Sequence, residues 1–159
     1  DKVVIKTKVV ERSTGELSFG AGFSTEDGVL GDIRLSERNF LGRGQDIRAN
    51  LTVSQRRQQI DISFTEPYFL ERDLAAGVDL FDSRTDFQRE SSYDESSIGG
   101  TLRLGYPLTE NLRHGVRYTL RDDQIHNVDD DASVFIKEEE GSRTTSLIGQ
   151  SFTYDRRDE

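Results

Sequence analysis

The feature that most constrains the fold of this chain is an alternation of apolar and polar residues with a period of two, which runs from residue 16 to residue 156. In the first segment, Leu17, Phe19, Ala21 and Phe23 alternate with Ser18, Gly20, Gly22 and Ser24. Such alternation indicates a β-strand with two unlike faces, because successive side chains of a strand point to opposite sides. The pattern recurs at residues 29–36, 46–53, 60–65, 74–80, 98–106, 112–121 and 148–154. We therefore predict about eight strands and no competing helical segment.

The connections between these segments differ in length in a regular way. One set is tight, at residues 39–44, 66–72 and 107–111, and the other set lengthens along the chain, at residues 25–28, 55–59, 82–97 and 122–142. In an up-and-down meander, every second connection lies at the same end. Outer-membrane barrels have this asymmetry, with short periplasmic turns and longer extracellular loops.

Aromatic residues gather at the end that carries the tight connections, as they do in the aromatic girdle of a membrane barrel. We expect the periplasmic turns and this girdle to contain Asn39, Phe40, Gly42, Gly44, Pro67, Tyr68, Phe69 and Tyr106.

The cost of charge in lipid decides which face points outward. An Arg or Lys on the lipid side of a barrel costs about 2 to 4 kcal/mol at the bilayer midplane. A register slip of one residue would turn Arg34, Arg48 or Arg103 outward. The apolar set is therefore expected to face lipid and the charged set the interior, where the Arg charges are offset by Asp32, Asp46, Asp61 and Asp79.

Alternation alone is also compatible with a soluble eight-stranded barrel or sandwich, in which the apolar face would point into a core. Three features favour the membrane barrel: the unequal connections, the sorted aromatics and the highly charged polar faces.

Composition excludes several function classes. No segment approaches the roughly 18 to 20 apolar residues of a membrane-spanning helix. The net charge of −9, with Arg interleaved among acidic residues, disfavours nucleic-acid binding. The chain has no Cys, and His114 and His126 do not complete a zinc site. The acidic runs at residues 129–131 and 138–140 lack EF-hand spacing and indicate a solvated loop. We expect no enzyme, no catalytic residue, no metal and no cofactor.

Several short motifs resemble the barrel of the BamA-type outer-membrane assembly proteins. They are Glu-Leu-Ser-Phe-Gly-Ala-Gly-Phe-Ser-Thr at 16–25, Asn-Phe-Leu-Gly-Arg-Gly at 39–44, Thr-Glu-Pro-Tyr-Phe at 65–69, Leu-Gly-Tyr-Pro-Leu at 104–108 and Phe-Thr-Tyr-Asp at 152–155. The resemblance implies a transmembrane β-barrel of sixteen strands that follows periplasmic POTRA repeats and inserts other β-barrels without ATP. Residues 1–12 would end the last POTRA repeat, and residues 13–159 would form the N-terminal half of the barrel. The later strands and an Arg-Gly-Phe loop motif have no counterpart, so the chain looks like part of a longer protein.

In this family the first barrel strand forms a lateral gate with the last one, and its edge pairs with client strands. The resemblance assigns this role to Glu16, Leu17, Ser18, Phe19, Gly20, Ala21, Gly22, Phe23 and Ser24. An edge strand offers unpaired N–H and C=O groups to an added strand. Gly20 and Gly22 either weaken the pairing of this strand and ease opening, or leave room for barrel curvature or a packed neighbour.

The resemblance also implies a location and partners. The location is the bacterial outer membrane, in the Gram-negative envelope, and the partners are its lipid bilayer, unfolded β-barrel clients and accessory assembly lipoproteins. The alternatives are a polypeptide-secreting barrel of the same superfamily and a small structural or porin-like barrel. Because lipid does not satisfy open sheet edges, we expect that the fragment either associates with a copy of itself or is only one segment of a larger chain.

Overall fold

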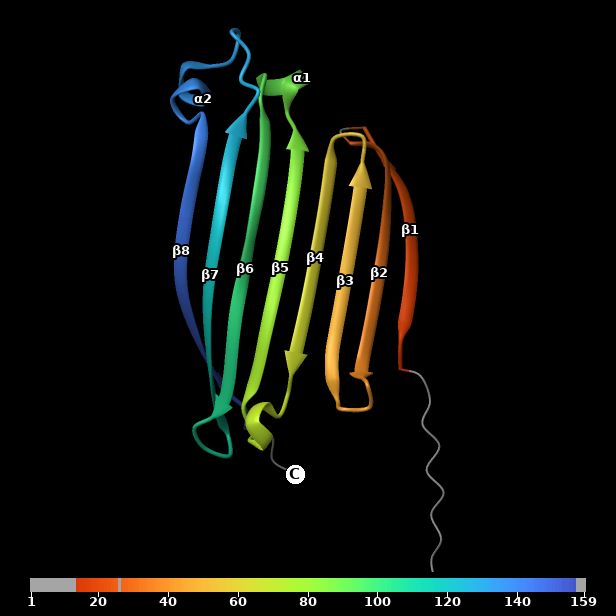
Figure 1. Ribbon diagram of the computed structural model, residues 1–159, viewed down its shortest axis with the longest axis vertical. Helices are drawn as coiled ribbons and strands as arrows, with labels where there is room; N and C mark the ends of the chain where they lie inside the picture. Colours follow the sequence, from red (N-terminus) through yellow and green to blue (C-terminus); the bar gives the residue numbers. More distant parts are fainter. Residues whose placement is uncertain (1–13, 26, 157–159) are drawn as a thin grey trace, which may run out of the picture.

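A computed structural model describes residues 14–25 and 27–156, which form one eight-stranded antiparallel sheet with its strands in sequence order (Figure 1). The strands are β1 (Glu16–Ser24), β2 (Gly28–Phe40), β3 (Gln45–Ser54), β4 (Arg57–Glu66), β5 (Ala75–Asp86), β6 (Asp94–Pro107), β7 (Leu112–His126) and β8 (Gly141–Tyr154). The predicted all-β, up-and-down architecture is confirmed. The expected end of a POTRA repeat at residues 1–12 lies outside the described residues.

The strand register confirms the two predicted faces. Leu17 lies opposite Leu35 and Phe19 opposite Ile33, whereas Ser18 lies opposite Arg34. Because paired residues of adjacent strands share a face, the apolar side chains of all eight strands form one continuous surface. We call it the outer face, and we call the opposite, charged surface the inner face.

The outer face is bare in the described part of the chain. Phe19 is 72% exposed, Leu102 is 57% exposed and Ile148 is 75% exposed, and Ala132 is the one described apolar residue classed as buried core. The sheet is a single layer, and neither β1 nor β8 has a second strand partner among the described residues. A soluble closed barrel or sandwich is therefore wrong for this part of the chain, because either fold would cover the apolar face.

Strands β5 to β8 are longer than predicted. The segments 82–97 and 122–142, expected to be loops, contain paired strand residues, and only residues 87–93 and 127–140 connect the strands. The reason is that the strand ends carry polar side chains on both faces. The outer face there holds Asp82, Arg84, Asp122 and Gln124 instead of apolar residues. Without an apolar face, the alternation that marks a strand disappears.

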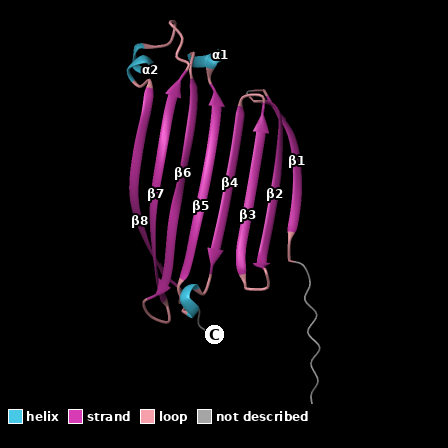
Figure 2. Ribbon diagram, viewed as in Figure 1, coloured by secondary structure: helices cyan, strands magenta, loops and turns pink. Residues whose placement is uncertain are grey.

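Short helices lie in the connections, where the sequence predicted none (Figure 2). They are a 3₁₀ turn, η1 (Phe69–Glu71), and two α-helical turns, α1 (Gln88–Ser91) and α2 (Val134–Glu138). Helix α2 begins after Ser133, whose hydroxyl accepts a hydrogen bond from the Ile136 N–H at 3.4 Å. Within the described ranges, no helix is long and apolar enough to cross a membrane.

The two ends of the sheet differ, as Figure 1 shows. Residues 41–44, 67–74 and 108–111 make the turns at the end near the C-terminus, which we call the turn end. At the opposite end, the loop end, the connections from Ser24 to Gly28 and from Ser54 to Arg57 are also tight. Residues 87–93, which contain α1, make a connection no longer than residues 67–74 at the turn end, and only residues 127–140, which contain α2, form a longer loop. The predicted asymmetry is therefore confined to the β7–β8 connection.

Candidate functional site at the edge of strand β1

Strand β1 forms one edge of the described sheet (Figure 1). It coincides with the segment assigned to the lateral gate, Glu16–Ser24, and all nine of its residues pair with β2. Backbone groups of a strand point alternately to its two sides, so half of the N–H and C=O groups of β1 point away from β2. Such groups can receive a further strand.

The two faces of β1 differ in bulk. Leu17, Phe19 and Phe23 on the outer face are 58%, 72% and 75% exposed. The inner face carries only small residues along its middle, namely Ser18, Gly20 and Gly22. A strand added beside β1 would therefore find an apolar outer surface and an almost empty inner one.

The glycines of β1 make room for side chains of β2. The Asp32 carboxylate occupies the position that a Cβ of Gly20 would take. The side chain of Leu30 lies 3.4 Å from the position of a Cβ on Gly22. This geometry favours the packing explanation of the two glycines. That the glycines also ease opening stays a prediction.

Side-chain bonds between strands are unevenly distributed. Between Leu17 and Phe23, no side-chain hydrogen bond or ion pair joins β1 to β2 in the described chain. The Ser18 hydroxyl donates instead to Glu16 on the same strand, at 3.4 Å. The nearest side-chain bond from this region to β2 joins Thr14 to Glu37 at the turn end. Backbone pairing and apolar contacts thus hold the middle of β1.

Strands β4 to β6, in contrast, are bonded through a cluster on the inner face. The Arg103 guanidinium contacts Asp79 at 2.6 Å and donates to Ser63 at 3.2 Å and to Thr65 at 3.0 Å. The Ser63 hydroxyl also donates to Asp79 at 2.7 Å. Further along the sheet, the Thr101 and Thr119 hydroxyls form a 2.8 Å hydrogen bond. This half of the sheet is therefore more firmly connected than the half that ends in β1.

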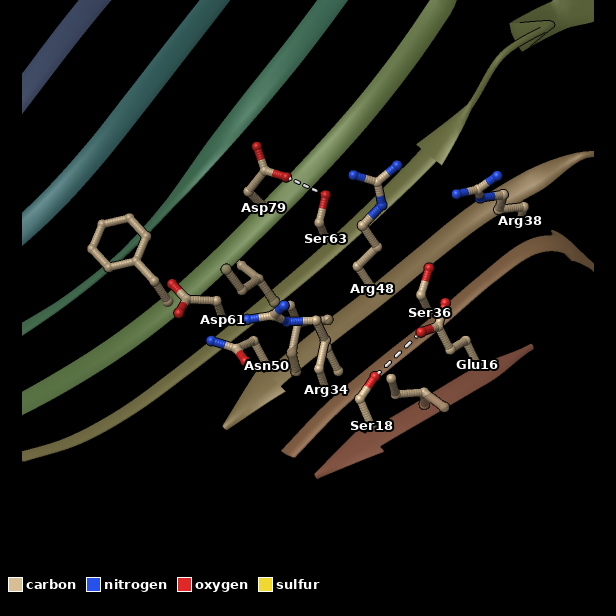
Figure 3. A pocket seen from close by; sticks show the side chains of 15 residues that line it. Glu16, Ser18, Arg34, Ser36, Arg38, Arg48, Asn50, Asp61, Ser63 and Asp79 are labelled. Atoms are coloured by element: carbon tan, nitrogen blue, oxygen red, sulfur yellow. Dashed lines mark hydrogen bonds between the residues drawn. The ribbon is translucent and has the colours of Figure 1, made fainter. Parts of the chain in front are cut away.

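A hollow of about 670 Å³ lies on the inner face of strands β1 to β5 (Figure 3). Arg34, Arg38, Arg48, Asn50 and Asp61 are among its lining residues. Arg48 pairs with Asp46 at 2.9 Å, but Arg34 and Arg38 have no hydrogen bond or ion pair with any described residue. The buried Oδ1 atom of Asn50 also lacks a hydrogen-bond partner. The hollow thus holds unused hydrogen-bond donors and acceptors next to the edge strand.

The residues predicted for the periplasmic turns lie together at the turn end. The Asn39 side-chain oxygen accepts a 2.6 Å hydrogen bond from the Gly44 N–H, and Gly42 and Gly44 have φ values of 69° and 71°. Glycine adopts this left-handed conformation without strain. Pro67 follows Glu66, the last residue of β4, and begins the next connection at this end.

The predicted aromatic residues occupy the same end. Phe40 is 37% exposed, Tyr68 is 66% exposed and Phe69 is 41% exposed. The Tyr106 hydroxyl is hydrogen-bonded to His114 Nδ1 at 2.8 Å, and the His114 ring stacks on Phe152 at 4.4 Å. Sequence reasoning missed the last two residues as members of this cluster, because the β6–β7 and β7–β8 registers bring them together.

Contacts between connections organise the loop end. Arg56 pairs with Glu90 and donates to the Asp86 carbonyl at 3.1 Å. Tyr93 stacks on Phe87 with ring centroids 5.2 Å apart. Burial, and secondarily the charges of Glu95 and Glu139, raise the pKa of the Tyr93 phenol. In the described residues, no group of His, Cys, Asp and Glu could hold a metal ion.

Comparisons with known proteins agree with this geometry. The BamA outer-membrane protein assembly factor of Nitratidesulfovibrio vulgaris is 36% identical over 160 aligned positions, which cover 99% of this chain and 20% of that protein. BamA of Neisseria meningitidis serogroup B is 29% identical over 114 positions, covering 69% of this chain and 14% of that protein. The chain therefore spans about a fifth or less of the length of these relatives.

A solved structure has the same fold. The crystal structure of BamA from Haemophilus ducreyi lacking POTRA domains 1–3 matches with a TM-score of 0.62 at 22% identity. The match covers 92% of this chain and 31% of that one. Residues 39–159 match the Omp85 superfamily domain. These findings confirm the resemblance to the BamA-type proteins, and the chain belongs to the Omp85 superfamily.

Proposed function

We propose that this chain is the N-terminal half of the barrel of an outer-membrane protein assembly factor, which folds and inserts β-barrel clients in the bacterial outer membrane. The relatives named above carry this function in their names. The bare outer face fits a lipid environment, because its middle is apolar on all eight strands. The inner face, with its charged side chains, fits a wet barrel interior.

The observation that carries the proposal is the open edge of β1, whose middle has no side-chain bonds to β2 in the described chain. We infer that a client strand adds to this edge. In lipid, an unpaired backbone group costs several kcal/mol, on the order of the penalty for burying an unbonded polar group. Pairing with β1 removes this cost as the client enters the bilayer. The proposed activity therefore needs no catalytic residue, cofactor or ATP.

The rest of the proposal concerns the whole protein, since this chain spans about a fifth or less of the length of the relatives named above. A strand that closes the barrel would compete with the client for the β1 edge. POTRA repeats and accessory assembly lipoproteins would deliver clients from the periplasmic side, where the turn end lies. The aromatic residues Phe40, Tyr68, Phe69 and Tyr106 would position the barrel at the membrane surface.

Site-specific crosslinking in cells tests the proposal. The chain has no natural Cys, so single Cys residues at each position from 16 to 24 can be paired with single Cys residues along the last strand of a client. We expect disulfides from several β1 positions and none from a control Cys at Leu102 in the middle of the sheet. Failure at every β1 position would contradict the proposal.

The two alternatives give different results in the same cells. Crosslinks to a polypeptide that crosses the membrane without inserting would favour the secreting barrel of the superfamily. Ion conductance by the purified protein, without any crosslink to clients, would favour the porin-like barrel.

A further inference from the structure

The inner face beside Gly20 leaves one carboxylate accessible from the sheet edge. Asp32 on β2 lies directly opposite Gly20 on β1, and its carboxylate extends over the glycine. No side chain of β1 stands between this carboxylate and the open side of the strand. Asp32 also has no hydrogen bond or ion pair with the described residues.

Other inward-facing carboxylates of the sheet have partners. Asp46 pairs with Arg48 at 2.9 Å, and Asp79 pairs with Arg103 at 2.6 Å. Asp61 accepts a hydrogen bond from Gln59 at 2.9 Å. Because a partly buried charge is costly unless it is paired, the free Asp32 carboxylate is suited to a cation that arrives from outside.

The registers of β1 and β2 set three different environments along this edge. Gly20 lies opposite the anionic Asp32, Ser18 lies opposite Arg34, and Gly22 lies opposite the apolar Leu30. All three β1 residues are small, so the β2 side chains determine what an added strand meets on the inner face. The order along the edge is therefore cationic, anionic and apolar.

This order of β2 side chains distinguishes between registers of an added strand that all keep its apolar residues on the outer face. A slip of one residue turns the apolar side chains of the added strand inward, and lipid rejects it. A slip of two residues keeps the faces correct. It would, however, move an inward Lys or Arg from Asp32 to either Arg34 or Leu30, where it meets like charge or no partner.

The distances allow this pairing. Neighbouring strands lie about 4.8 Å apart, so an added strand would be about two spacings from β2. The Asp32 carboxylate already extends over Gly20 and shortens that gap. A long basic side chain on the added strand can cover the remainder, since no Cβ of Gly20 is in its way.

We propose that Asp32 selects the register of a client strand at the β1 edge by pairing, across Gly20, with a Lys or Arg on the inward face of that strand. The inference rests on the proposed function and adds a specificity residue to it. Asp32 acts here by direct contact with the client, whereas Arg34 disfavours the register shifted by two residues.

Disulfide scanning in the full-length protein, reconstituted in liposomes, tests this pairing. A Cys replaces Ala21 on the outer face, and single Cys residues are scanned along the last strand of a client with one inward Lys. We expect the register that places Lys beside Gly20 to exceed the registers shifted by two residues by about threefold or more, the range of one accessible ion pair. Asp32→Lys should shift the maximum to another register, and a client with Glu in place of Lys should restore it.

The control is Asp61→Lys, which reverses an inward carboxylate on β4, two strands from β2. It should leave the crosslink distribution unchanged. Restoration by the Glu client also shows that Asp32→Lys is folded. An unchanged register in both Asp32→Asn and Asp32→Lys would overturn the inference.

Two further outcomes would separate a failure of this inference from a failure of the proposed function. If charge dependence appeared only in crosslinks to the protein's own strands, the assignment to clients would be wrong. The absence of any client crosslink in the unmodified protein would contradict the proposed function itself.

Discussion

The Arg103 guanidinium on β6 holds the Asp79 carboxylate on β5 through two hydrogen bonds, Nε to Oδ2 at 2.6 Å and Nη2 to Oδ1 at 2.9 Å. The side chains are 37% and 31% exposed, so water weakens but does not abolish the interaction. With the bonds to Ser63 and Thr65, this pair connects three strands on the inner face.

Replacing Arg103 by Ala should destabilise the folded protein. We expect a loss of about 1 to 2 kcal/mol, because charge-assisted bonds are removed and the partly buried Asp79 carboxylate keeps only the hydrogen bond from Ser63. Urea unfolding of the full-length protein in liposomes measures this. The matched control is Arg34→Ala, which removes an inward Arg that has no described partner. Equal losses in the two variants would contradict the role of the pair.

Gly77→Ala should act through the same pair. A Cβ on Gly77 would lie 2.7 Å from Cζ of Arg103, so the guanidinium has to move away. We expect a cost of about 1 kcal/mol alone and much less in the Arg103→Ala background, because neighbouring residues that share one interaction are not additive. A double-mutant cycle by urea unfolding checks this. Additive losses would show that Gly77 has a separate role.

Charge on the outer face should block membrane insertion. Leu102→Arg on β6 should cost about 2 to 4 kcal/mol, because Leu102 lies near the middle of the apolar belt. Gly105→Arg on the same strand is the control, since it points to the inner face and the position of its Cβ has no atom within 4 Å. The folded fraction is measured by gel electrophoresis in the cold, in which folded and heat-unfolded barrels migrate differently. Similar losses for the two variants would show that the face assignment is wrong.

Arg56→Ala should loosen the loop end. Arg56 joins the β3–β4 connection to Glu90 and to the Asp86 carbonyl, and its side chain is only 11% exposed. Hydrogen exchange of residues 87–93 should become faster by about fivefold or more, the effect of losing one bond of roughly 1 kcal/mol. Arg57→Ala removes the neighbouring exposed Arg and should change little. The same exchange rate in both variants would contradict this role of Arg56.

Tyr93 should ionise at a higher pH than an ordinary tyrosine. Burial disfavours the phenolate, and Glu95 and Glu139 add to this effect, so the pKa of Tyr93 lies above the ordinary tyrosine value of 10.0. Because the unfolded chain ionises first, this residue's contribution to stability decreases as pH rises past about 10. A difference titration at the tyrosinate absorption band, native protein against Tyr93→Phe, gives the midpoint. Glu139→Gln should lower it, and a midpoint at or below the ordinary value would refute the assignment.

The sequence was sufficient to predict most strands, and the reason is physical. Lipid on one side and water on the other impose a period of two wherever a strand crosses the bilayer. The same reasoning failed where both sides meet water. From Asp82 to Asp86, β5 carries only polar residues on both faces, so its sequence contains no sign of a strand there, although Asp82 itself pairs with Ile60 and Ile98. The helical turns α1 and α2 are too short to show a helical period.

The candidate site was predictable only in part. The bounds of the edge strand and its two glycines could be read from residues 16–24, because the alternation and the motif lie within one segment. The position of Asp32 over Gly20 could not, because it depends on the register in which β2 pairs with β1. The same limit concealed His114 and Phe152, which contact each other only through the β7–β8 register.

The uneven distribution of side-chain bonds has a mechanical consequence. In the described chain, the facing stretches of β1, β2 and β3 are held by backbone pairing and apolar contacts. Counting strands from the β1 edge, the first hydrogen bond between two side chains that joins β3 to β4 runs from Gln45 to Glu66 at 2.7 Å. A tension applied along the edge would therefore be absorbed by the outermost strands. Rupture would stop at β4, where the Arg103 cluster begins. The sheet is thus compliant on one side and stiff on the other, and strain at the β1 edge would reach β5 to β8 much reduced.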